Sequence, residues 1–455
     1  MVADALRRTD VRAQSRATPA WRAWAMPLAW FAIHAPLVYA MRFSPLVGVA
    51  HFALVMTVGL AIALQWRGSE RVAYVAMYIA GAEVLWRMMG VAEHGVFWEA
   101  GKYGSSLLFL VAIARSGRLR APWLPLLYFA ALMPSVVPVY VEHGIAEIRR
   151  SLSFNLSGPF ALLVSAWFFH RLSLGPRDLR ALFLAYLGPC CGVAFAALFG
   201  IAAAGAIEFS AQSLFQTAGG YGPNQVSAAL GLGAVFALAH AQMSARTPAE
   251  RTGAIAIAVW LFAQSMFTFS RGGVYNTVGA IAVAGLFVLR DPAQALRYAL
   301  SVATAAIVFM VVVFPALNAY TGGALEARFE DTRGTGREEI ARADLEVWRN
   351  HFVLGVGPGQ SAGQREDAAG AAAHTEYTRL LSEHGVFGLF ALLLMLGTAV
   401  VAVLRAPPGA PRALTAAMAA WALLFMLHAA MRLVLPSLLL GLCLARVRAE
   451  DTRPT

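Results

Sequence analysis

The sequence predicts an all-α, polytopic integral membrane protein with about 12–14 transmembrane helices. Three observations carry this prediction. Hydrophobic residues make up 59% of the 455 positions and charged residues only 13%, which is too little charge to cover the surface of a soluble chain of this length. Apolar runs of about 18–22 residues, each long enough to cross a bilayer, recur along the chain. Arginines are concentrated in alternate connections between these runs.

Fourteen apolar runs, separated at Arg, Pro and Gly, are predicted as membrane spans. Their centres lie near Phe31, Val55, Ile79, Leu108, Phe129, Leu163, Val193, Gly233, Val259, Val283, Ile307, Leu392, Ala420 and Leu440. The chain then divides into a basic N-terminal segment (1–22), an N-terminal transmembrane bundle of about eleven helices (23–316), a large loop (317–383), C-terminal transmembrane helices (384–448) and a tail (449–455). The N-terminal segment leads into no small-residue cleavage site, so we expect no cleaved signal peptide.

The positive-inside rule orients the bundle in a bacterial inner membrane. Every member of one set of alternate connections is basic, as at Arg67 and Arg71 or at Arg246 and Arg251. In the other set, the two shortest connections carry one arginine each, Arg42 and Arg432. We therefore expect both termini in the cytoplasm and the large loop in the periplasm. The net charge of +11 does not indicate nucleic-acid binding, because the basic residues lie in short, separate loops.

The sequence offers no metal or cofactor site. Cys190, Cys191 and Cys443 lie inside apolar runs without the spacing of a metal site or a disulfide. We expect these cysteines to act as small apolar core residues.

The periplasmic loop is predicted to contain short helices. Residues 337–350 (REEIARADLEVWRN) have the pattern of an amphipathic helix, with Ile340, Ala343 and Val347 on one side. Residues 354–361 (LGVGPGQS) predict a tight glycine turn. Long ordered loops are usually functional, which directs attention to this side of the membrane.

Three predicted spans enter the membrane from the periplasmic side, near Asn224, Arg271 and Glu383. Helix N-termini carry free N–H groups and partial positive charge, so they favour anions. Residues 219–225 (GGYGPNQ) approach the first of these spans through glycines, which indicates either a ligand site or a plain loop-to-helix turn. At the second, Ser270 stands at a cap position before Arg271, and two glycines follow that let a ligand approach the backbone.

The third span follows the segment 374–385 (HTEYTRLLSEHG). Its His374 is a natural general base at neutral pH, and Glu376 and Glu383 share one helical face. Glu83 and Arg87, four residues apart in an earlier span, are a further candidate pair. Intramembrane ionisable pairs are often functional, but such a pair can equally lock neighbouring helices together.

In their order along the chain, these motifs resemble those of the O-antigen ligases and the related O-antigen polymerases. The resemblance rests on Tyr221-Gly222-Pro223-Asn224, Ser270-Arg271-Gly272, the glycine turn at 354–359, and His374-x-Glu376-Tyr377-x-x-Leu380-x-x-Glu383-x-Gly385-x-x-Gly388. It covers roughly residues 219–390.

The resemblance implies a membrane glycosyltransferase that uses neither metal nor cofactor. Such enzymes take a glycan from undecaprenyl diphosphate and pass it to an acceptor hydroxyl, with ligation to lipid A–core as the leading version here. Polymerisation of O-antigen or exopolysaccharide, or transfer to a protein hydroxyl, is the same chemistry with another acceptor. The resemblance assigns His374 to proton removal, while Glu376 either orients His374 or caps its helix.

For the donor diphosphate, Arg271 matches the family's phosphate-binding arginine. Arg337, Arg342 and Arg349 on the loop helix add to that site, and Ser270, Asn224, Glu383 and Glu83 support it. Arginine suits this role through permanently charged, bidentate contacts. One feature departs from the family: residues 207–216 contain no arginine, where members often carry another essential one. Either Arg87, Arg149 or Arg150 replaces it, or the phosphate is held differently.

Two readings from other classes remain. A polysaccharide or lipid-glycan transporter should place ionisable residues near the bilayer midplane and at paired broken helices. An assembly factor without activity would not need His374 or Arg271. The gathering of ionisable residues at one interface, beside a long loop with a histidine, favours the enzyme.

Overall fold

The computed structural model describes residues 27–65, 69–117, 120–288, 292–331, 336–365 and 373–448. Its longer helices are α3 (His34–Phe43), α4 (Pro45–Ala63), α5 (Ser69–Met88), α6 (Ala100–Ser116), α7 (Trp123–Ala131), α8 (Val136–Asn155), α9 (Ser157–Phe169), α10 (Pro176–Ala203), α11 (Pro223–Met243), α12 (Pro248–Phe267), α13 (Arg271–Val288), α14 (Pro292–Val308), α15 (Phe314–Tyr320), α16 (Ala324–Glu330), α17 (Arg337–Asn350), α18 (Glu376–Arg405), α19 (Ala410–Ala429) and α20 (Leu435–Leu442). Two-residue strands, β1 (Ser173–Leu174) and β2 (Arg446–Val447), pair in parallel. The all-α class is confirmed. The predicted N-terminal segment and C-terminal tail lie outside the described residues.

Among the described residues, seven helices are long and apolar enough to cross a membrane, or eight if the bent pair α7–α8 is one span. The protein is therefore a multi-pass membrane protein. All fourteen predicted centres fall in helical residues. The other predicted spans are shorter, such as α20 with 8 residues, or more polar, such as α5 with Glu83 and Arg87. The larger number of crossings, about 12–14, stays a prediction.

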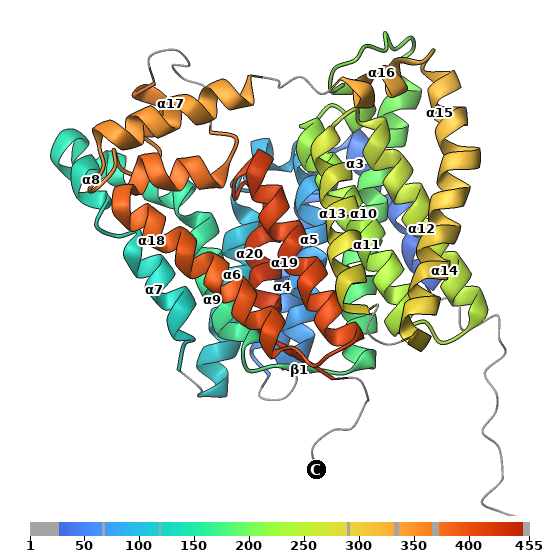
Figure 1. Ribbon diagram of the computed structural model, residues 1–455, viewed down its shortest axis with the longest axis horizontal. Coiled ribbons are helices and arrows are strands. Elements are labelled where there is room, and N and C mark those ends of the chain that lie inside the picture. The colour runs from blue at the N-terminus through green and yellow to red at the C-terminus, as the bar shows by residue number, and fades with distance from the viewer. Residues whose placement is uncertain are drawn as a thin grey trace, which may run out of the picture.

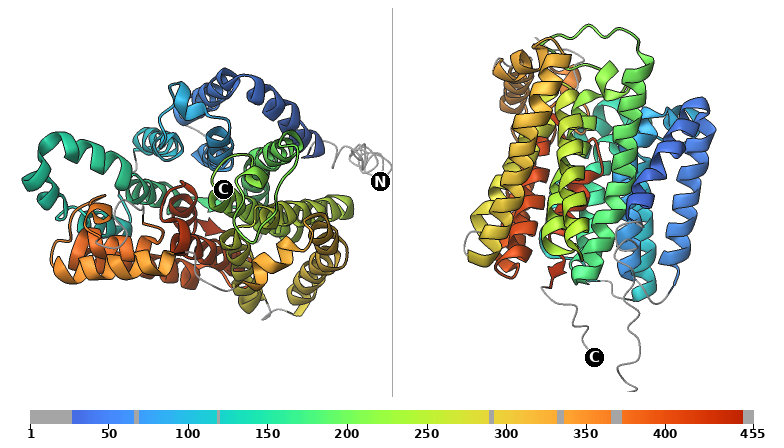
Figure 2. Two further views of the ribbon diagram at one scale, coloured as in Figure 1. Left: turned by 90° about the horizontal axis from the view of Figure 1, so that it is seen from above. Right: turned by 90° about the vertical axis from the view of Figure 1, so that its right-hand side faces the viewer.

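The helices run between two ends of the molecule (Figure 1). One end carries α16, α17 and residues 373–376 and is called the loop face below; the opposite end carries β1 and β2. Seen along this direction, α7, α8, α17 and α18 gather on one side and α10–α15 on the other, with α19 and α20 between them (Figure 2).

Small residues bring α11 and α13 into close contact. A Cβ atom on Gly231 would meet the Thr277 hydroxyl and the carbonyl oxygen of Gly273, and one on Gly273 would meet Ser227. Such small-residue contacts let helix backbones approach within a membrane. Because α11 and α13 begin at the loop face, this packing also fixes the positions of their N-termini relative to each other.

The predicted loop helix is confirmed as α17, with the predicted residues 337–350. Ala343 and Val347 on its predicted inner side are buried. The tight glycine turn predicted at 354–361 is also present: Gly355, Gly357 and Gly359 have φ of 69°, 94° and 79°. At each of these positions a Cβ atom would be strained as well as crowded by neighbouring atoms.

The span predicted to start near Glu383 begins earlier, at Glu376, and is broken at Gly385. Gly385 has φ 61° and ψ −137°, a conformation that only glycine adopts readily. After the break the chain turns so sharply that Gly388 packs against the carbonyl oxygen of Leu380. The first part of α18 consequently packs beside α17 at the loop face, and only the second part continues into the bundle (Figure 1).

Candidate active site at the loop face

The N-termini of α11 and α13 are joined by hydrogen bonds. The Ser270 hydroxyl donates to Asn224 Oδ1 at 2.9 Å, and Asn224 Nδ2 donates to the His428 carbonyl oxygen at 3.0 Å. Pro223 occupies the first turn of α11, as predicted. The two predicted supporting residues, Asn224 and Ser270, are thus in direct contact. They tie the start of Arg271's helix to the end of α19.

Two strained turns present arginines at this face. Among the described residues, Phe269 (φ 58°) and Ala430 (φ 49°) are the non-glycine residues with positive φ. Each stands two positions before an arginine, Arg271 and Arg432. Strained backbone of this kind is frequent where a fixed side-chain position matters for function.

Arg328 of α16 holds one of these turns in place. Its guanidinium donates to the carbonyl oxygen of Phe269 at 2.8 Å, to that of Ala211 at 3.1 Å and to the Ser213 hydroxyl at 3.3 Å. Ala211 and Ser213 belong to the segment 207–216, in which the sequence has no arginine. An arginine from the loop therefore lies against this segment, although sequence reasoning did not select Arg328.

Arg271, Arg328 and Arg432 lie close enough to Arg337 for their positive charges to act on it, and these four residues are called the arginine set below. The pKa of Arg337 is lowered by burial and by the positive charges of Arg271, Arg328 and Arg432. Arg271 donates to the carbonyl oxygen of Asp331, and Arg432 Nη2 to that of Ala373 at 2.8 Å. The arrangement suits an anion with several oxygens.

His374 stands beside the arginine set, because Arg432 binds the carbonyl oxygen of the preceding residue. The His374 side chain is half-buried, and its pKa is lowered to about 4 by burial and by the positive charges of Arg432, Arg337 and Arg365. At neutral pH the imidazole is therefore unprotonated and able to accept a proton. An anion bound to the arginine set would offset these charges and raise the pKa of His374.

Glu376 belongs to a buried ionic network below His374. Arg379 donates to both Glu376 oxygens, at 2.5 and 2.9 Å, and to Glu383 Oε2 at 2.7 Å. The backbone N–H of Met431 donates to Glu376 Oε2 at 3.3 Å. The cap of α18 is supplied by Thr375, whose hydroxyl accepts from the Tyr377 N–H at 3.3 Å. Glu376 therefore links α18 to the turn that carries Arg432.

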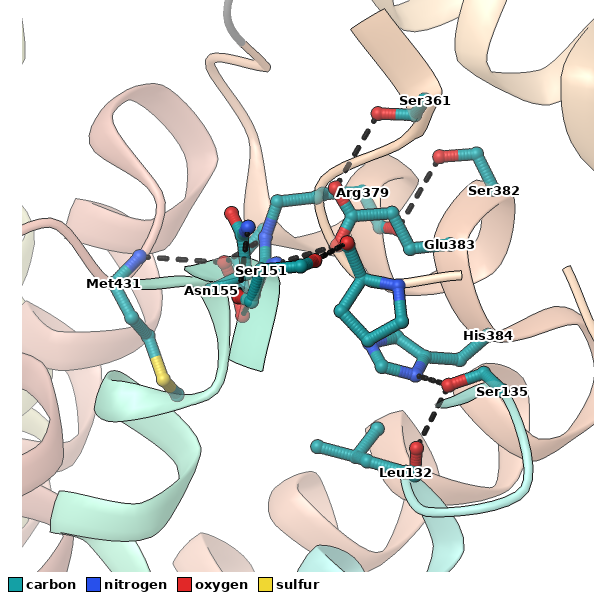
Figure 3. Close-up of polar contacts among 12 residues, drawn as sticks. Leu132, Ser135, Ser151, Asn155, Ser361, Arg379, Ser382, Glu383, His384 and Met431 are labelled. Atoms are coloured by element: carbon teal, nitrogen blue, oxygen red, sulfur yellow. Dashed lines mark hydrogen bonds and ion pairs between the residues drawn. The ribbon is translucent and has the colours of Figure 1, made fainter. Parts of the chain in front are cut away.

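Glu383 of this network and the neighbouring His384 make further buried contacts (Figure 3). The Ser361 hydroxyl donates to Glu383 Oε1 at 3.4 Å, and His384 Nδ1 lies 2.5 Å from the Ser135 hydroxyl oxygen. Asp344 of α17 binds Arg365 at 2.7 Å and the Thr378 hydroxyl at 2.8 Å. These buried contacts fix the glycine turn, α17 and the first part of α18 to each other.

The predicted pair Glu83–Arg87 is buried, with Arg87 Nη2 2.8 Å from Glu83 Oε1. Arg87 Nη2 also donates to the carbonyl oxygen of Arg432 at 3.0 Å, and Glu83 Oε2 accepts from the Val434 N–H at 2.8 Å. The pair thus joins α5 to the 430–434 segment. A second buried pair, Glu99–Lys102, is held by Ser157, whose hydroxyl oxygen lies 3.1 Å from Lys102 Nζ.

Between these pairs lies a cavity of about 490 Å³, called the side cavity below. Its walls come from α5, α6, α8, the glycine turn, α18 and the 430–432 turn. They are Arg87, Trp98, Glu99, Lys102, Phe154, Asn155, Gln225, Gly359, Ser361, Ala362, Ala373, Glu376, Arg379, Glu383, Ala430, Met431 and Arg432. Ala373 and Glu376 stand on either side of His374 in the chain, so the cavity borders the segment that carries the candidate base.

Two predicted diphosphate-binding residues lie elsewhere. Arg342 and Arg349 are exposed on α17, where Arg342 lies 4.0 Å from Glu338 of the same helix. Arg149, a proposed replacement for the missing arginine, is exposed on α8, and the side chain of Arg150 is not described. Within the described ranges, no three His, Cys, Asp or Glu side chains are grouped so as to hold a metal ion.

The fold and this face define a multi-pass, all-α membrane protein whose polar residues converge on a long loop. Residues 256–393 match a family model described as O-antigen ligase. The match covers α13, the loop with α16 and α17, and His374 with most of α18. It confirms the resemblance to the O-antigen ligase family. No curated protein and no solved structure matched.

Proposed function

We propose that this protein transfers a glycan from undecaprenyl diphosphate to an acceptor hydroxyl, with ligation to lipid A–core as the leading reaction. The observation that carries the proposal is the position of His374, an unprotonated imidazole next to the residue that Arg432 binds and close enough to Arg337 to feel its charge. The family match supports the same class of reaction. On this proposal the protein lies in the bacterial inner membrane, with the loop face in the periplasm and both termini in the cytoplasm.

In the proposed reaction, one bond breaks and one forms at the anomeric carbon of the donor sugar. The acceptor hydroxyl oxygen bonds to this carbon, and its proton passes to a ring nitrogen of His374. The bond from the carbon to the diphosphate oxygen breaks, and the electron pair leaves with undecaprenyl diphosphate. The arginine set stabilises the negative charge that develops on that leaving group. The lipid tail stays in the bilayer while the headgroup reacts at the interface.

Deletion of the gene, followed by electrophoresis of the lipopolysaccharide, tests the proposal. Loss of a ligase leaves bare core and accumulated lipid-linked glycan. Loss of a polymerase leaves core that carries single units, and unchanged lipopolysaccharide with an altered exopolysaccharide or glycoprotein identifies another acceptor. Normal amounts of every such glycan in the deletion strain would contradict the proposal. Restoration by the wild-type gene, but not by the His374→Ala variant, connects the phenotype to the candidate site.

A further inference from the structure

The side cavity has the size of a small-molecule site. Its volume of about 490 Å³ lies within the usual range of ligand pockets, about 300–1,000 Å³. Donors and acceptors alternate along its walls, including Asn155, Gln225 and Ser361. A ligand with many hydroxyl groups can satisfy such walls from several sides.

Except for Arg432, the cations at the side cavity are bound to carboxylates. Arg87 binds Glu83, Lys102 binds Glu99, and Arg379 binds both Glu376 and Glu383. These cations are committed to buried carboxylates, so the cavity does not offer them to a diphosphate. The ion pairs instead present fixed polar atoms with little net charge, which favours a neutral polar ligand.

Two aromatic rings line the cavity without being buried. Trp98 is 44% exposed and Phe154 is 54% exposed. The guanidinium of Arg87 lies over the Trp98 ring, 5.1 Å from its centroid, which holds the indole in place. Exposed, fixed aromatic rings among hydrogen-bonding groups suit sugars, because a sugar ring offers C–H groups on its faces and hydroxyls at its edge.

Arg432 belongs both to the wall of the cavity and to the arginine set. It lines the cavity and binds the Ala373 carbonyl oxygen, and its charge also acts on Arg337 and on His374. A ligand in the cavity would therefore lie near Arg432 and the segment that contains His374. Displacement at an anomeric carbon puts the entering hydroxyl and the leaving diphosphate on opposite sides of the carbon, so the acceptor and the diphosphate need separate sites.

We infer that the side cavity binds the acceptor, through an uncharged sugar ring that packs on Trp98 and Phe154 and turns one hydroxyl toward His374. This inference rests on the proposed function and adds the chemical class and the place of the second substrate. The sugar is the end of a lipid-linked core or of a growing glycan, which present the same hydroxyl chemistry.

The test uses purified full-length protein with two substrates extracted from the deletion strain, the undecaprenyl-diphosphate-linked glycan and the unmodified lipid A–core. Trp98→Ala and Phe154→Ala should each raise the KM for lipid A–core by about tenfold and change the KM for the donor by less than twofold. Phe97→Ala is the matched control, because Phe97 precedes Trp98, is 56% exposed and does not line the cavity. It should change neither constant.

An unchanged KM for lipid A–core in both aromatic variants, or a raised KM for the donor instead, would overturn the inference. Binding of lipid A–core to the same purified proteins is measured separately, without donor. If the wild-type protein transfers nothing but binds lipid A–core more tightly than Trp98→Ala does, the proposed reaction is wrong and the sugar site stands. If wild type and variant bind it equally, the sugar site is wrong whatever the outcome of the transfer assay.

Discussion

The arginine set and the side cavity lie next to each other, yet their charges are organised in opposite ways. In the arginine set, Arg271 and Arg432 are anchored by backbone carbonyl oxygens, and positive charges accumulate around Arg337. In the side cavity, Arg87, Lys102 and Arg379 are bound to buried carboxylates. On the proposed function, this difference would place the charged leaving group at the arginine set and the neutral sugar in the side cavity.

The two regions also call for different experiments. Removing one partner of a buried ion pair typically costs about 3–5 kcal/mol, so variants at Lys102 or Arg379 would lose stability along with any binding. Trp98 and Phe154 are exposed and belong to no ion pair, so replacing them leaves no buried charge without its partner. In the arginine set, a substitution that keeps the positive charge, such as Arg271→Lys, tests the planar guanidinium without removing a charge.

The largest effect is expected for His374→Ala, which removes the group shared by both regions. Without a base, transfer should fall by about 10²–10⁴-fold. The rate of glycan transfer in purified protein measures this, with protein level and donor binding as controls. Undiminished transfer by this variant would show that His374 is not the base and that the two regions do not share it as a catalytic group.

A smaller loss is expected for Arg271→Lys, which sharpens the role of the arginine set. The lysine keeps the charge but loses the planar fork that matches phosphate oxygens, so transfer should fall by about 10–100-fold. Arg342→Lys on the exposed side of α17 is the control and should remain active. Normal turnover of the lipid-diphosphate donor by Arg271→Lys would refute a bidentate contact.

The pH dependence tests whether the arginine set acts on His374. The pKa of His374 is lowered to about 4 in the free protein, so falling pH removes the base only as it passes through that value. A bound diphosphate offsets Arg432 and Arg337, which raises the pKa of His374. The acid limb of kcat should therefore lie at higher pH than the acid limb of kcat/KM for the donor. Rates at saturating and limiting donor measure both limbs; coincident limbs near the ordinary histidine pKa would contradict the coupling.

The smallest effect is expected for Ala430→Gly, in the turn that carries Arg432. Glycine adopts the positive φ of this position without a Cβ penalty, so the variant should gain up to about 1 kcal/mol of stability. Thermal unfolding in detergent measures the change. Ala429→Gly, at the preceding helical position, should lose stability instead. A destabilised Ala430→Gly protein would show that the turn does not hold the conformation described.

Local patterns in the sequence predicted much of this face. The amphipathic spacing predicted α17, and the Ser270-Arg271 and Pro223-Asn224 motifs predicted where α13 and α11 begin. The match to the family model supports placing His374 and Arg271 in one site. The kink in α18 had a signal in Gly385 and Gly388, but the polar segment before Glu383 hid the helix start, because α18 begins while still outside the apolar run.

Contacts between residues far apart in the chain were beyond prediction. Arg87 and Arg432 are 345 positions apart, and Arg328 and Ala211 are 117 apart. Arg432 had one signal, since an arginine on the side opposite the basic connections runs against the positive-inside rule. Arg328 had none beyond its place in the loop. The hydrogen-bonded chain His51–Tyr78–His34 likewise joins three helices whose proximity no local pattern reveals.

The separation of the two substrates is tested most directly by measuring both Michaelis constants in two variants of the same purified protein. Arg337→Gln should raise the KM for the undecaprenyl-diphosphate-linked donor and leave that for lipid A–core within twofold. Trp98→Ala should do the reverse. If both variants raise the same Michaelis constant, the arginine set and the side cavity do not divide donor from acceptor. The same follows if Arg337→Gln raises only the KM for lipid A–core and Trp98→Ala only the KM for the donor.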